Sequence, residues 1–261
     1  MELKVIAYAR NGHTDKFGIP RQSREESPIV TRIVFEPDYS VREALRGIEG
    51  FSHLWLLWGF DKGERLKLKG ERGEWSPTVR PPRLGGNVRM GVFATRSPFR
   101  PNPIGLSSVK LLGVEEIEIT RPRDHETTTE RKALALVVSG ADLMDGTPIY
   151  DIKPYLSFSD SHPEAKNGFA EQTKDYRLEV DWGEFADAWY PNQGEHSRDC
   201  LENGSALSRD WLDDASFILS QDPRPAYQDD STREYKLDYA GYTITFTVDG
   251  QTVHVKNIVK I

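Results

Sequence analysis

The sequence predicts a mainly β protein: an N-terminal single β-barrel domain, which is not a Rossmann fold, followed by a smaller α+β domain. The first 157 residues contain many short apolar or β-branched runs, and clusters of Gly and Pro separate them. These runs show no alternation of strand and helix, which argues against a dinucleotide-binding domain. Over residues 157–168 the pattern loosens into polar and turn-forming residues. We therefore expect a barrel domain over residues 1–160 and an accessory domain over residues 161–261.

In the first domain we expect seven short strands, because many short strands with few helices are typical of an antiparallel barrel or sandwich. Val41–Leu45 has room for one or two helical turns. The expected strands are Val5–Ala9, Ile29–Phe35, Leu54–Phe60, Arg89–Thr95, Ser107–Leu112, Glu116–Ile119 and Ala133–Val138.

In the second domain the pattern indicates both strands and a helix. Tyr176–Trp182 is expected to be a strand, and the apolar residues of Ser205–Ser220 recur at helical spacing. Two further expected strands, Tyr242–Val248 and Gln251–Val259, flank Asp249-Gly250. That dipeptide is a strong signal for a two-residue hairpin turn.

The length and composition indicate a folded chain. At about 150 residues per domain, 261 residues correspond to roughly one and a half to two domains. Hydrophobic residues make up 37% of the chain, which supports a folded core over a disordered chain. The longest apolar run, Leu54–Phe60, is far shorter than the roughly 20 residues of a membrane span. Met1–Val5 lacks the pattern of a signal peptide, so we expect neither a membrane protein nor a secreted one.

Cysteine and histidine usage indicates a cytoplasmic protein without a metal. Cys200 is the only cysteine, so the chain forms no internal disulfide and no cysteine-rich zinc site. The six histidines never fall at the short spacings of a helical metal site.

The net charge of −7 is unevenly distributed. Residues 1–157 carry 24 Lys and Arg against 21 Asp and Glu, a net charge of +3, whereas residues 158–261 carry 10 against 20, a net charge of −10. A negative net charge argues weakly against a polyanionic partner, but a partner binds one local surface, whose charge can differ from that of the whole chain. The first segment is compatible with a nucleic acid, and the second by itself is not.

The densest motif runs from Arg96 to Ser107. It places Arg96 and Arg100 among three prolines, between two expected strands. Proline fixes φ, so such a loop holds its side chains at low entropic cost. The arginine fork suits a carboxylate, a phosphate or a base edge. The alternative is a stiff surface turn with solvated arginines.

A second motif places Asp142 and Asp145 three residues apart after an apolar run. One interpretation is a pair of acceptors for hydroxyl or ammonium groups at the rim of a barrel. The other is an ordinary turn, because Asp-Gly-Thr-Pro is a common turn sequence. The sequence has no acyl-transfer elbow, phosphate-binding glycine loop or dinucleotide fingerprint. These residues alone therefore predict a β-rich domain with a loop site lined by Arg and Asp, and nothing more specific.

Five segments, in this order, resemble the TsaA/TrmO family of S-adenosylmethionine-dependent tRNA methyltransferases. They are residues 20–22, 80–87, 96–107, 142–155 and 222–227, the last of which looks like the signature of the family's C-terminal domain. The resemblance implies a small β-barrel catalytic domain and methylation of N6 of threonylcarbamoyladenosine, beside the anticodon of a threonine tRNA. It also implies a homodimer with the cofactor pocket near the subunit interface. Thr120–Arg131 looks longer and more polar than in relatives, and the acidic C-terminal domain departs from what direct tRNA contact requires.

The resemblance and the chemistry of S-adenosylmethionine together suggest roles for site residues. We expect Arg96 either to bind the cofactor carboxylate or to belong to the loop that positions it. We expect Asp142 and Asp145 to bind the ribose diol or the ammonium group. Asp145 is also a hypothetical catalytic base, with Arg100 and Asn102 as further catalytic candidates. Arg100, Lys153 and Tyr155 are candidates for substrate contacts. The full expected cofactor set is Pro20, Arg21, Gln22, Phe60, Asp61, Arg96, Leu106, Asp142 and Asp145.

Two other functions stay open at this stage. One is a non-catalytic barrel that binds S-adenosylmethionine or RNA as a sensor. The other is a hydrolase or a small-molecule methyltransferase on the same barrel, although no nucleophile–base pair is visible in the sequence.

Overall fold

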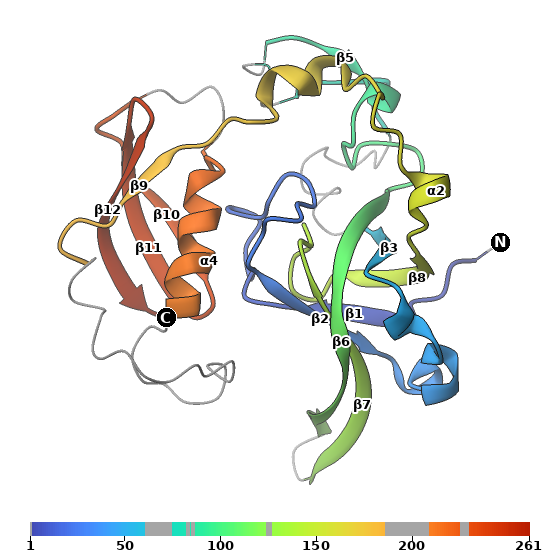
Figure 1. Cartoon of the computed structure of the whole chain (residues 1–261). Coiled ribbons are helices and arrows are strands. Elements are labelled where there is room, and N and C mark those ends of the chain that lie inside the picture. Colours follow the sequence, from blue (N-terminus) through green and yellow to red (C-terminus); the bar gives the residue numbers. More distant parts are fainter. Residues whose placement is uncertain are drawn as a thin grey trace. The chain divides into compact units, whose positions relative to one another are not determined.

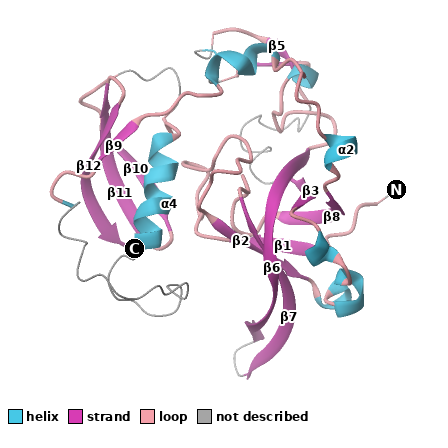
Figure 2. Ribbon diagram, in the orientation of Figure 1, coloured by secondary structure: helices cyan, strands magenta, loops and turns pink. Residues whose placement is uncertain are grey.

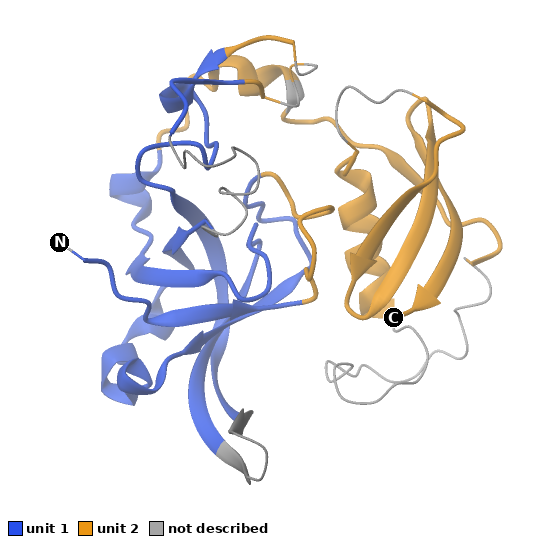
Figure 3. Ribbon diagram, turned by 180° about the vertical axis from the view of Figure 1, so that it is seen from behind, with its two compact units in different colours: residues 1–11, 22–79, 90–161 blue, residues 12–21, 80–89, 162–261 orange. Residues whose placement is uncertain are grey.

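The computed structural model describes residues 2–60, 75–81, 84, 87–123, 127–185, 209–224 and 230–261, with the backbone alone at 120–123, 127–130 and 173. It divides into two compact units (Figure 3). Unit 1 comprises residues 1–11, 22–79 and 90–161, and unit 2 comprises residues 12–21, 80–89 and 162–261. Within the described residues, no helix has the length and apolar character needed to cross a membrane.

Unit 1 is a six-stranded antiparallel barrel (Figures 1 and 2). Its strands follow one another around the barrel in the order β1-β2-β7-β6-β3-β8, and the ladder between β1 and β8 has two residue pairs. The prediction of a mainly β chain with an N-terminal barrel is confirmed. The strands are β1 (Ala7–Arg10), β2 (Val30–Phe35), β3 (His53–Gly59), β6 (Ile104–Arg123), β7 (Thr127–Ser139) and β8 (Pro148–Pro154).

Alternate residues of these strands fill the barrel, as the two-residue period of a strand requires. On β3, for example, Leu54, Leu56 and Trp58 are buried, whereas the residues between them are partly exposed. The core includes Ala7, Ala9, Ile33, Phe35, Leu54, Leu56, Trp58, Val109, Leu136, Val138 and Ile149.

β6 and β7 form a hairpin longer than predicted. The sequence predicts separate strands over Ser107–Leu112 and Glu116–Ile119, but β6 is continuous. Gly113 causes no break, because the register shifts between Leu111 and Gly113 and the ladder then continues to Arg123↔Thr127. The expected polar hairpin over residues 120–131 is therefore the far end of this ladder, and residues 124–126 lie outside the described part of the chain.

The predicted strand Arg89–Thr95 is largely wrong. A two-residue strand β5 (Met90–Gly91) pairs with β4 (Thr78–Val79), and the chain then turns into the 3₁₀ helix η6 (Val92–Ala94). The turn is favoured because side chains further along the loop, described below, hydrogen-bond its carbonyl groups.

Short helical turns and β8 complete unit 1. β8 is not predicted from the sequence, because the Asp-Gly-Thr-Pro turn before it dominates the local pattern. Tyr150 of β8 packs closely over β3, since a Cβ at Gly59 would overlap its ring. The helical turns are η1 (Pro37–Tyr39), η2 (Arg42–Leu45), η3 (Ile48–Gly50) and α2 (Ser157–Asp160).

Unit 2 is an α+β unit, as predicted. Its sheet has the order β10-β11-β12-β9, with β9 parallel to β12, and helix α4 lies along the sheet (Figure 1). The predicted strand Tyr176–Trp182 shortens to β9, and the predicted helix is described from residue 209 onward. The elements are η7 (Gly168–Thr173), β9 (Glu179–Asp181), α4 (Arg209–Ser220), β10 (Tyr235–Tyr239), β11 (Tyr242–Asp249) and β12 (Thr252–Lys260).

The hairpin between β11 and β12 is confirmed with a shift of one residue. Asp249 pairs with Thr252, so the turn residues are Gly250 and Gln251 rather than Asp249 and Gly250. Gly250 has a φ of 57°, a conformation in which glycine is favoured.

The loop of residues 12–21 belongs to unit 2, although it follows β1 in sequence. Phe17 stacks on Phe246 with ring centroids 6.4 Å apart. Gly18 has a φ of 103°, and a Cβ there would overlap Leu237. Only glycine fits this position, so the loop has a defined place within unit 2.

Candidate active site

Arg96 lies in a loop that neighbouring side chains hold in shape. Thr95 Oγ1 donates a hydrogen bond to the carbonyl of Val92 at 2.8 Å. Arg100 Nη2 donates to the same carbonyl at 3.4 Å and to the carbonyl of Thr95 at 3.1 Å. The structure thus places Arg100, a predicted substrate contact, across the carbonyl groups of its own loop. Asn102, a few residues further on, is exposed.

Gln22 and Arg96 come together from positions 74 residues apart. Arg96 Nη1 donates to Gln22 Oε1 at 2.6 Å, and the Arg96 residue is exposed. Both residues belong to unit 1. The contact brings together two of the segments that carry the family resemblance, and the guanidinium keeps donors for an anionic partner.

Asp142 is held by a relay of hydrogen bonds from the barrel interior. Trp58 Nε1 on β3 donates to Ser107 Oγ on β6 at 2.9 Å, and Ser107 Oγ donates to Asp142 Oδ1. Ser107 is fully buried and Trp58 is 8% exposed. Two adjacent strands therefore fix the orientation of the Asp142 carboxyl.

The environment of Asp142 shifts the pKa of its carboxyl group. Burial raises the pKa of the Asp142 carboxyl above its ordinary value. The hydrogen bond from Ser107, backbone N–H groups at Asp142 and Ser23, and the positive charge of Arg96 act in the opposite direction. The carboxyl therefore takes up a proton at a higher pH than an exposed aspartate does, and Arg96 lies close enough to affect its charge.

Apolar groups lie beside this relay. The rings of Trp58 and Phe60 meet edge to face with centroids 4.4 Å apart. Gly105 lets the Trp58 indole lie directly on β6, because a Cβ at Gly105 would overlap that ring. Leu106, between Gly105 and Ser107 in sequence, faces the outer side of β6, opposite to Ser107, and is 49% exposed. We call Gln22, Trp58, Arg96, Ser107 and Asp142 the Arg96–Asp142 cluster.

Asp145 has different partners from Asp142. Its Oδ2 pairs with Arg10 Nη1 at 3.3 Å, and its Oδ1 accepts from the backbone N–H of Asn11 at 3.2 Å. Asn11 in turn donates to the carbonyl of Leu143 at 2.9 Å. These contacts tie the turn after β7 to the end of β1, which fits the structural interpretation of the Asp-Gly-Thr-Pro segment.

Lys153 and Tyr155 lie toward the opposite end of β3 from Trp58. Lys153 Nζ pairs with Asp151 Oδ2 at 2.8 Å, and the Tyr155 ring lies 5.5 Å from that of Trp55. The Tyr155 backbone N–H bonds to the carbonyl of His53, the first residue of β3. Five residues of strand span about 16 Å, so Tyr155 and the Arg96–Asp142 cluster are separate sites.

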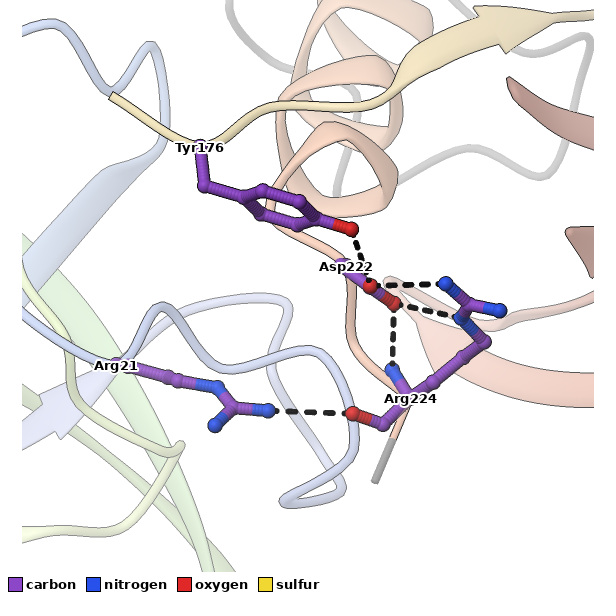
Figure 4. Close-up of polar contacts among 4 residues, drawn as sticks. All are labelled: Arg21, Tyr176, Asp222 and Arg224. Atoms are coloured by element: carbon purple, nitrogen blue, oxygen red, sulfur yellow. Dashed lines mark hydrogen bonds and ion pairs between the residues drawn. The ribbon is translucent and has the colours of Figure 1, made fainter. Parts of the chain in front are cut away.

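Pro20 and Arg21 lie in unit 2, and Figure 4 shows Arg21 beside Arg224. Pro20 is buried, and Arg21 Nη2 donates to the backbone carbonyl of Arg224 at 3.2 Å. Arg224 makes a two-pronged ion pair with Asp222, and Tyr176 also hydrogen-bonds that carboxylate. Asp61, another predicted cofactor residue, lies outside the described residues.

The cluster combines a cation, a carboxyl and aromatic surface. Such a set suits a small zwitterionic ligand with a ring, because each polar end meets a group of opposite charge. The part of the chain that the structure describes contains no group of three or more His, Cys, Asp or Glu side chains arranged around a metal ion.

Comparison with protein families identifies the chain. Residues 8–161, more than half of its length, match the tRNA-methyltransferase O (TrmO) N-terminal domain. The chain belongs to the TrmO family. Residues 211–261 match the TrmO C-terminal domain, which agrees with the family resemblance of residues 222–227.

Individual relatives agree with this family. The tRNA (adenine(37)-N6)-methyltransferase of Escherichia coli K12 is 36% identical over 230 residues, which cover 87% of this chain and 83% of the relative. The protein of the same name from Eikenella corrodens is 43% identical over 200 residues, 76% of this chain and 92% of the relative. A protein from Archaeoglobus fulgidus named a probable S-adenosyl-L-methionine-binding protein is 34% identical over 172 residues, 66% of this chain and 38% of the relative.

A solved structure also matches. The crystal structure of TrmO from Pseudomonas aeruginosa has a TM-score of 0.67 and 28% sequence identity, and the match covers 99% of this chain and 98% of that chain.

Trp58 and Ser107 belong to the cluster but were not predicted from the sequence as candidate site residues. A signal for Ser107 was present, because Gly105, Ser107 and Val109 all occupy inward-facing positions of β6. A hydroxyl at an inward position needs a partner, and Asp142 supplies it. Trp58 gave no such signal, since a buried indole on a core strand is common.

Proposed function

We propose that this protein methylates N6 of adenine 37 in tRNA with S-adenosylmethionine as the methyl donor, and that the Arg96–Asp142 cluster binds that cofactor. Membership of the TrmO family and the names of the Escherichia coli and Archaeoglobus relatives support the activity and the cofactor. The observation that carries the site assignment is the convergence of Gln22, Arg96 and Asp142 in unit 1.

The chemistry of the cluster fits the chemistry of the cofactor. S-adenosylmethionine has a carboxylate, an ammonium group, a ribose diol, an adenine ring and a sulfonium cation. The exposed guanidinium of Arg96 suits the carboxylate. The Asp142 carboxyl, fixed by Ser107, suits the diol or the ammonium group. Phe60, whose ring meets that of Trp58, offers apolar surface for the adenine, whereas Leu106 faces the other side of β6 from Ser107.

The cofactor supplies an electrophilic methyl group on its sulfonium. The residues of the cluster contribute alignment and exclusion of water, which are the main sources of acceleration in a displacement of this kind. We assign Asp142 rather than Asp145 to hold a proton near the site, because Asp145 is occupied by Arg10 and Asn11. Arg100 acts by keeping the Arg96 loop in shape.

The substrate in this proposal is the threonylcarbamoylated adenosine of a threonine tRNA, modified in the cytoplasm by a homodimer. Lys153 and Tyr155 lie away from the cluster, and Asn102 is exposed, so we assign these three residues to contacts with the RNA. Tyr155 offers a ring for stacking, and Lys153 offers a cation for a phosphate.

Methyl transfer from labelled S-adenosylmethionine tests the proposal. We expect label in threonine tRNA that carries the threonylcarbamoyl group, and none in the same tRNA made without it. Arg96→Ala should raise the Kd for the cofactor at least tenfold, whereas Arg131→Ala, on the outer part of the β6–β7 hairpin, should leave it unchanged. Equal labelling of both tRNAs contradicts the substrate. Binding of the cofactor without transfer supports the sensor alternative instead.

A further inference from the structure

Two aromatic rings of unit 1 stack on each other at the surface. Trp75 lies shortly before β4, and Phe93 lies in the 3₁₀ helix η6. Their ring centroids are 6.2 Å apart, and the two ring planes are 25° from parallel. The two residues are nevertheless 44% and 74% exposed, so packing in a core does not explain why the rings are held together. We call Trp75 and Phe93 the aromatic platform.

Backbone hydrogen bonds join the two segments that carry the platform. β4 and β5 pair beside the rings. The Val92 N–H donates to the carbonyl of Pro77 at 2.9 Å, and the Ser76 N–H donates to the carbonyl of Phe99 at 3.0 Å. Each of the two donors is the direct sequence neighbour of a platform residue, so these bonds fix the backbone from which the rings project. A surface that is ordered in advance binds its partner at a lower entropic cost.

The platform belongs to the same loop as Arg96. Arg100 Nη2 bonds to the carbonyl groups of Val92 and Thr95. The first of these residues precedes Phe93, and the second precedes Arg96. Phe93 and Arg96 are three residues apart, so their Cα atoms are separated by at most about 11 Å. One guanidinium therefore restrains both the backbone beside the ring and the backbone beside the proposed cofactor ligand.

An unpaired nucleobase suits a surface of this kind. Single-stranded bases stack on exposed aromatic side chains, and the bases of an RNA loop are accessible for such contacts. The residues that follow Phe93 are Ala94, Thr95 and Arg96, so the rings do not continue into a broad apolar surface along this segment. A stable protein–protein interface buries a much larger area than two rings offer, which favours a base over a protein partner.

We propose that Trp75 and Phe93 bind tRNA by stacking on a base of the anticodon loop next to adenine 37. This inference rests on the proposed function, which brings adenine 37 to the cofactor at the Arg96–Asp142 cluster. Every base has a π face, so the platform orients the loop without reading its sequence. Sequence preference then has to come from other contacts.

Three substitutions separate stacking from general apolar contact. Phe93→Leu keeps an apolar side chain but removes the ring, whereas Phe93→Tyr keeps the ring. Trp75→Leu removes the second ring of the platform. Val41→Ala is the matched control, because Val41 is an apolar residue of unit 1 that is 45% exposed, as Trp75 nearly is, and it lies before η2.

The test is the Kd of threonine tRNA that carries the threonylcarbamoyl group, measured on the full chain. The tRNA is made with 2-aminopurine on the 5′ or the 3′ side of adenine 37, because the fluorescence of this base falls when it stacks. We expect Phe93→Leu and Trp75→Leu each to raise the Kd at least about fivefold and to restore the fluorescence. Phe93→Tyr and Val41→Ala should leave the Kd within about twofold. The Kd of S-adenosylmethionine without tRNA should stay within about twofold in all four variants, which also shows that they fold.

Several results would overturn the inference. One is a tRNA Kd within about twofold of the wild type for Phe93→Leu or Trp75→Leu, and another is an equal loss for Phe93→Leu and Phe93→Tyr. Unquenched 2-aminopurine on both sides of adenine 37 in the wild-type complex also overturns it. A loss of cofactor affinity larger than the loss of tRNA affinity does so too, because it assigns the rings to the adenine of the cofactor.

Failure of the proposed function gives a different result. Wild-type protein that binds this tRNA through the platform but transfers no methyl group overturns the proposed function and leaves the role of the platform standing. Wild-type protein that binds no tRNA overturns both.

Discussion

Ser107 is the residue on which the geometry of the cluster depends most. Its hydroxyl accepts from Trp58 Nε1 and donates to Asp142 Oδ1, so it joins a core strand to a residue of the site. Each partner is buried or partly buried, and a buried polar group without a partner is costly. One hydroxyl therefore affects both the stability of the barrel and the orientation of the Asp142 carboxyl.

Ser107→Ala removes only the hydroxyl, so it tests the effect on stability and the effect on cofactor binding. Leaving the Trp58 N–H unsatisfied should cost about 1–3 kcal/mol of unfolding free energy. Loss of the hydrogen bond to Asp142 should weaken S-adenosylmethionine binding about tenfold, or about 1.4 kcal/mol. Urea unfolding and calorimetry measure the two quantities. Ser108→Ala, the next residue on β6 and only partly buried, is the control and should change neither.

At the scale of elements, β6 organises the site. It carries Gly105, Leu106 and Ser107 in succession, and it bonds to β3 on one side and β7 on the other. Gly105 and Gly113 lie on this strand in different surroundings. A Cβ at Gly105 would overlap the Trp58 ring, whereas a Cβ at Gly113 would meet nothing within 4 Å.

Gly105→Ala should therefore displace the Trp58 indole and weaken its hydrogen bond to Ser107. We expect a loss of about 1–3 kcal/mol of stability and a clear loss of cofactor affinity. The matched change Gly113→Ala should cost less than about 1 kcal/mol and leave binding intact. Thermal unfolding with and without cofactor compares the two. Equal effects of the two substitutions would show that Trp58 does not depend on Gly105.

A second element-scale prediction concerns pH. In unit 2, His13 lies against the Tyr239 ring, and Tyr239 Oη donates to Asp214 Oδ2 at 2.6 Å. Burial lowers the pKa of His13 to about 4. Burial raises the pKa of Asp214 to about 6, with a further rise from the charges of Asp210 and Asp213.

These two shifts have opposite consequences for stability. Between pH 6.5 and 4 the unfolded chain protonates His13 more readily, so acid removes about 3 kcal/mol of stability. Between pH 6 and 3.8 the folded chain protonates Asp214 more readily, so acid adds about 3 kcal/mol. The wild type should show little net slope from this pair. Urea unfolding should reveal falling stability in acid for Asp214→Asn and rising stability for His13→Asn. Slopes that match the wild type would contradict the two shifts.

The elements differ in how far the sequence alone predicts them. Strands rich in β-branched residues, such as Ile29–Phe35 and Ala133–Val138, were predicted because their pattern is local. Arg89–Thr95 was predicted wrongly, because two of the hydrogen bonds that favour its 3₁₀ turn come from Arg100, beyond the segment. The Gln22–Arg96 contact spans 74 residues and leaves no local trace, so only the family resemblance pointed to it.

At the scale of the whole molecule, the charge distribution changes what the net charge of −7 suggests. Residues 1–157, which contain the barrel strands, carry +3, and residues 158–261 carry −10. Taken as a whole, the charge argues against an RNA partner, yet the barrel half is compatible with one. A weakly basic half fits the proposed recognition of RNA by a few placed side chains such as Lys153, rather than by a broad cationic surface.

The central proposal is methylation of N6 of adenine 37 in tRNA, with the cofactor bound at the Arg96–Asp142 cluster. Mass spectrometry of nucleosides from the tRNA of cells lacking this protein tests it most directly. We predict that the methyl group is missing from threonylcarbamoyladenosine alone, that the wild-type gene restores it, and that an Arg96→Ala gene does not. An unchanged nucleoside profile in the deleted cells, or full restoration by Arg96→Ala, would contradict the account.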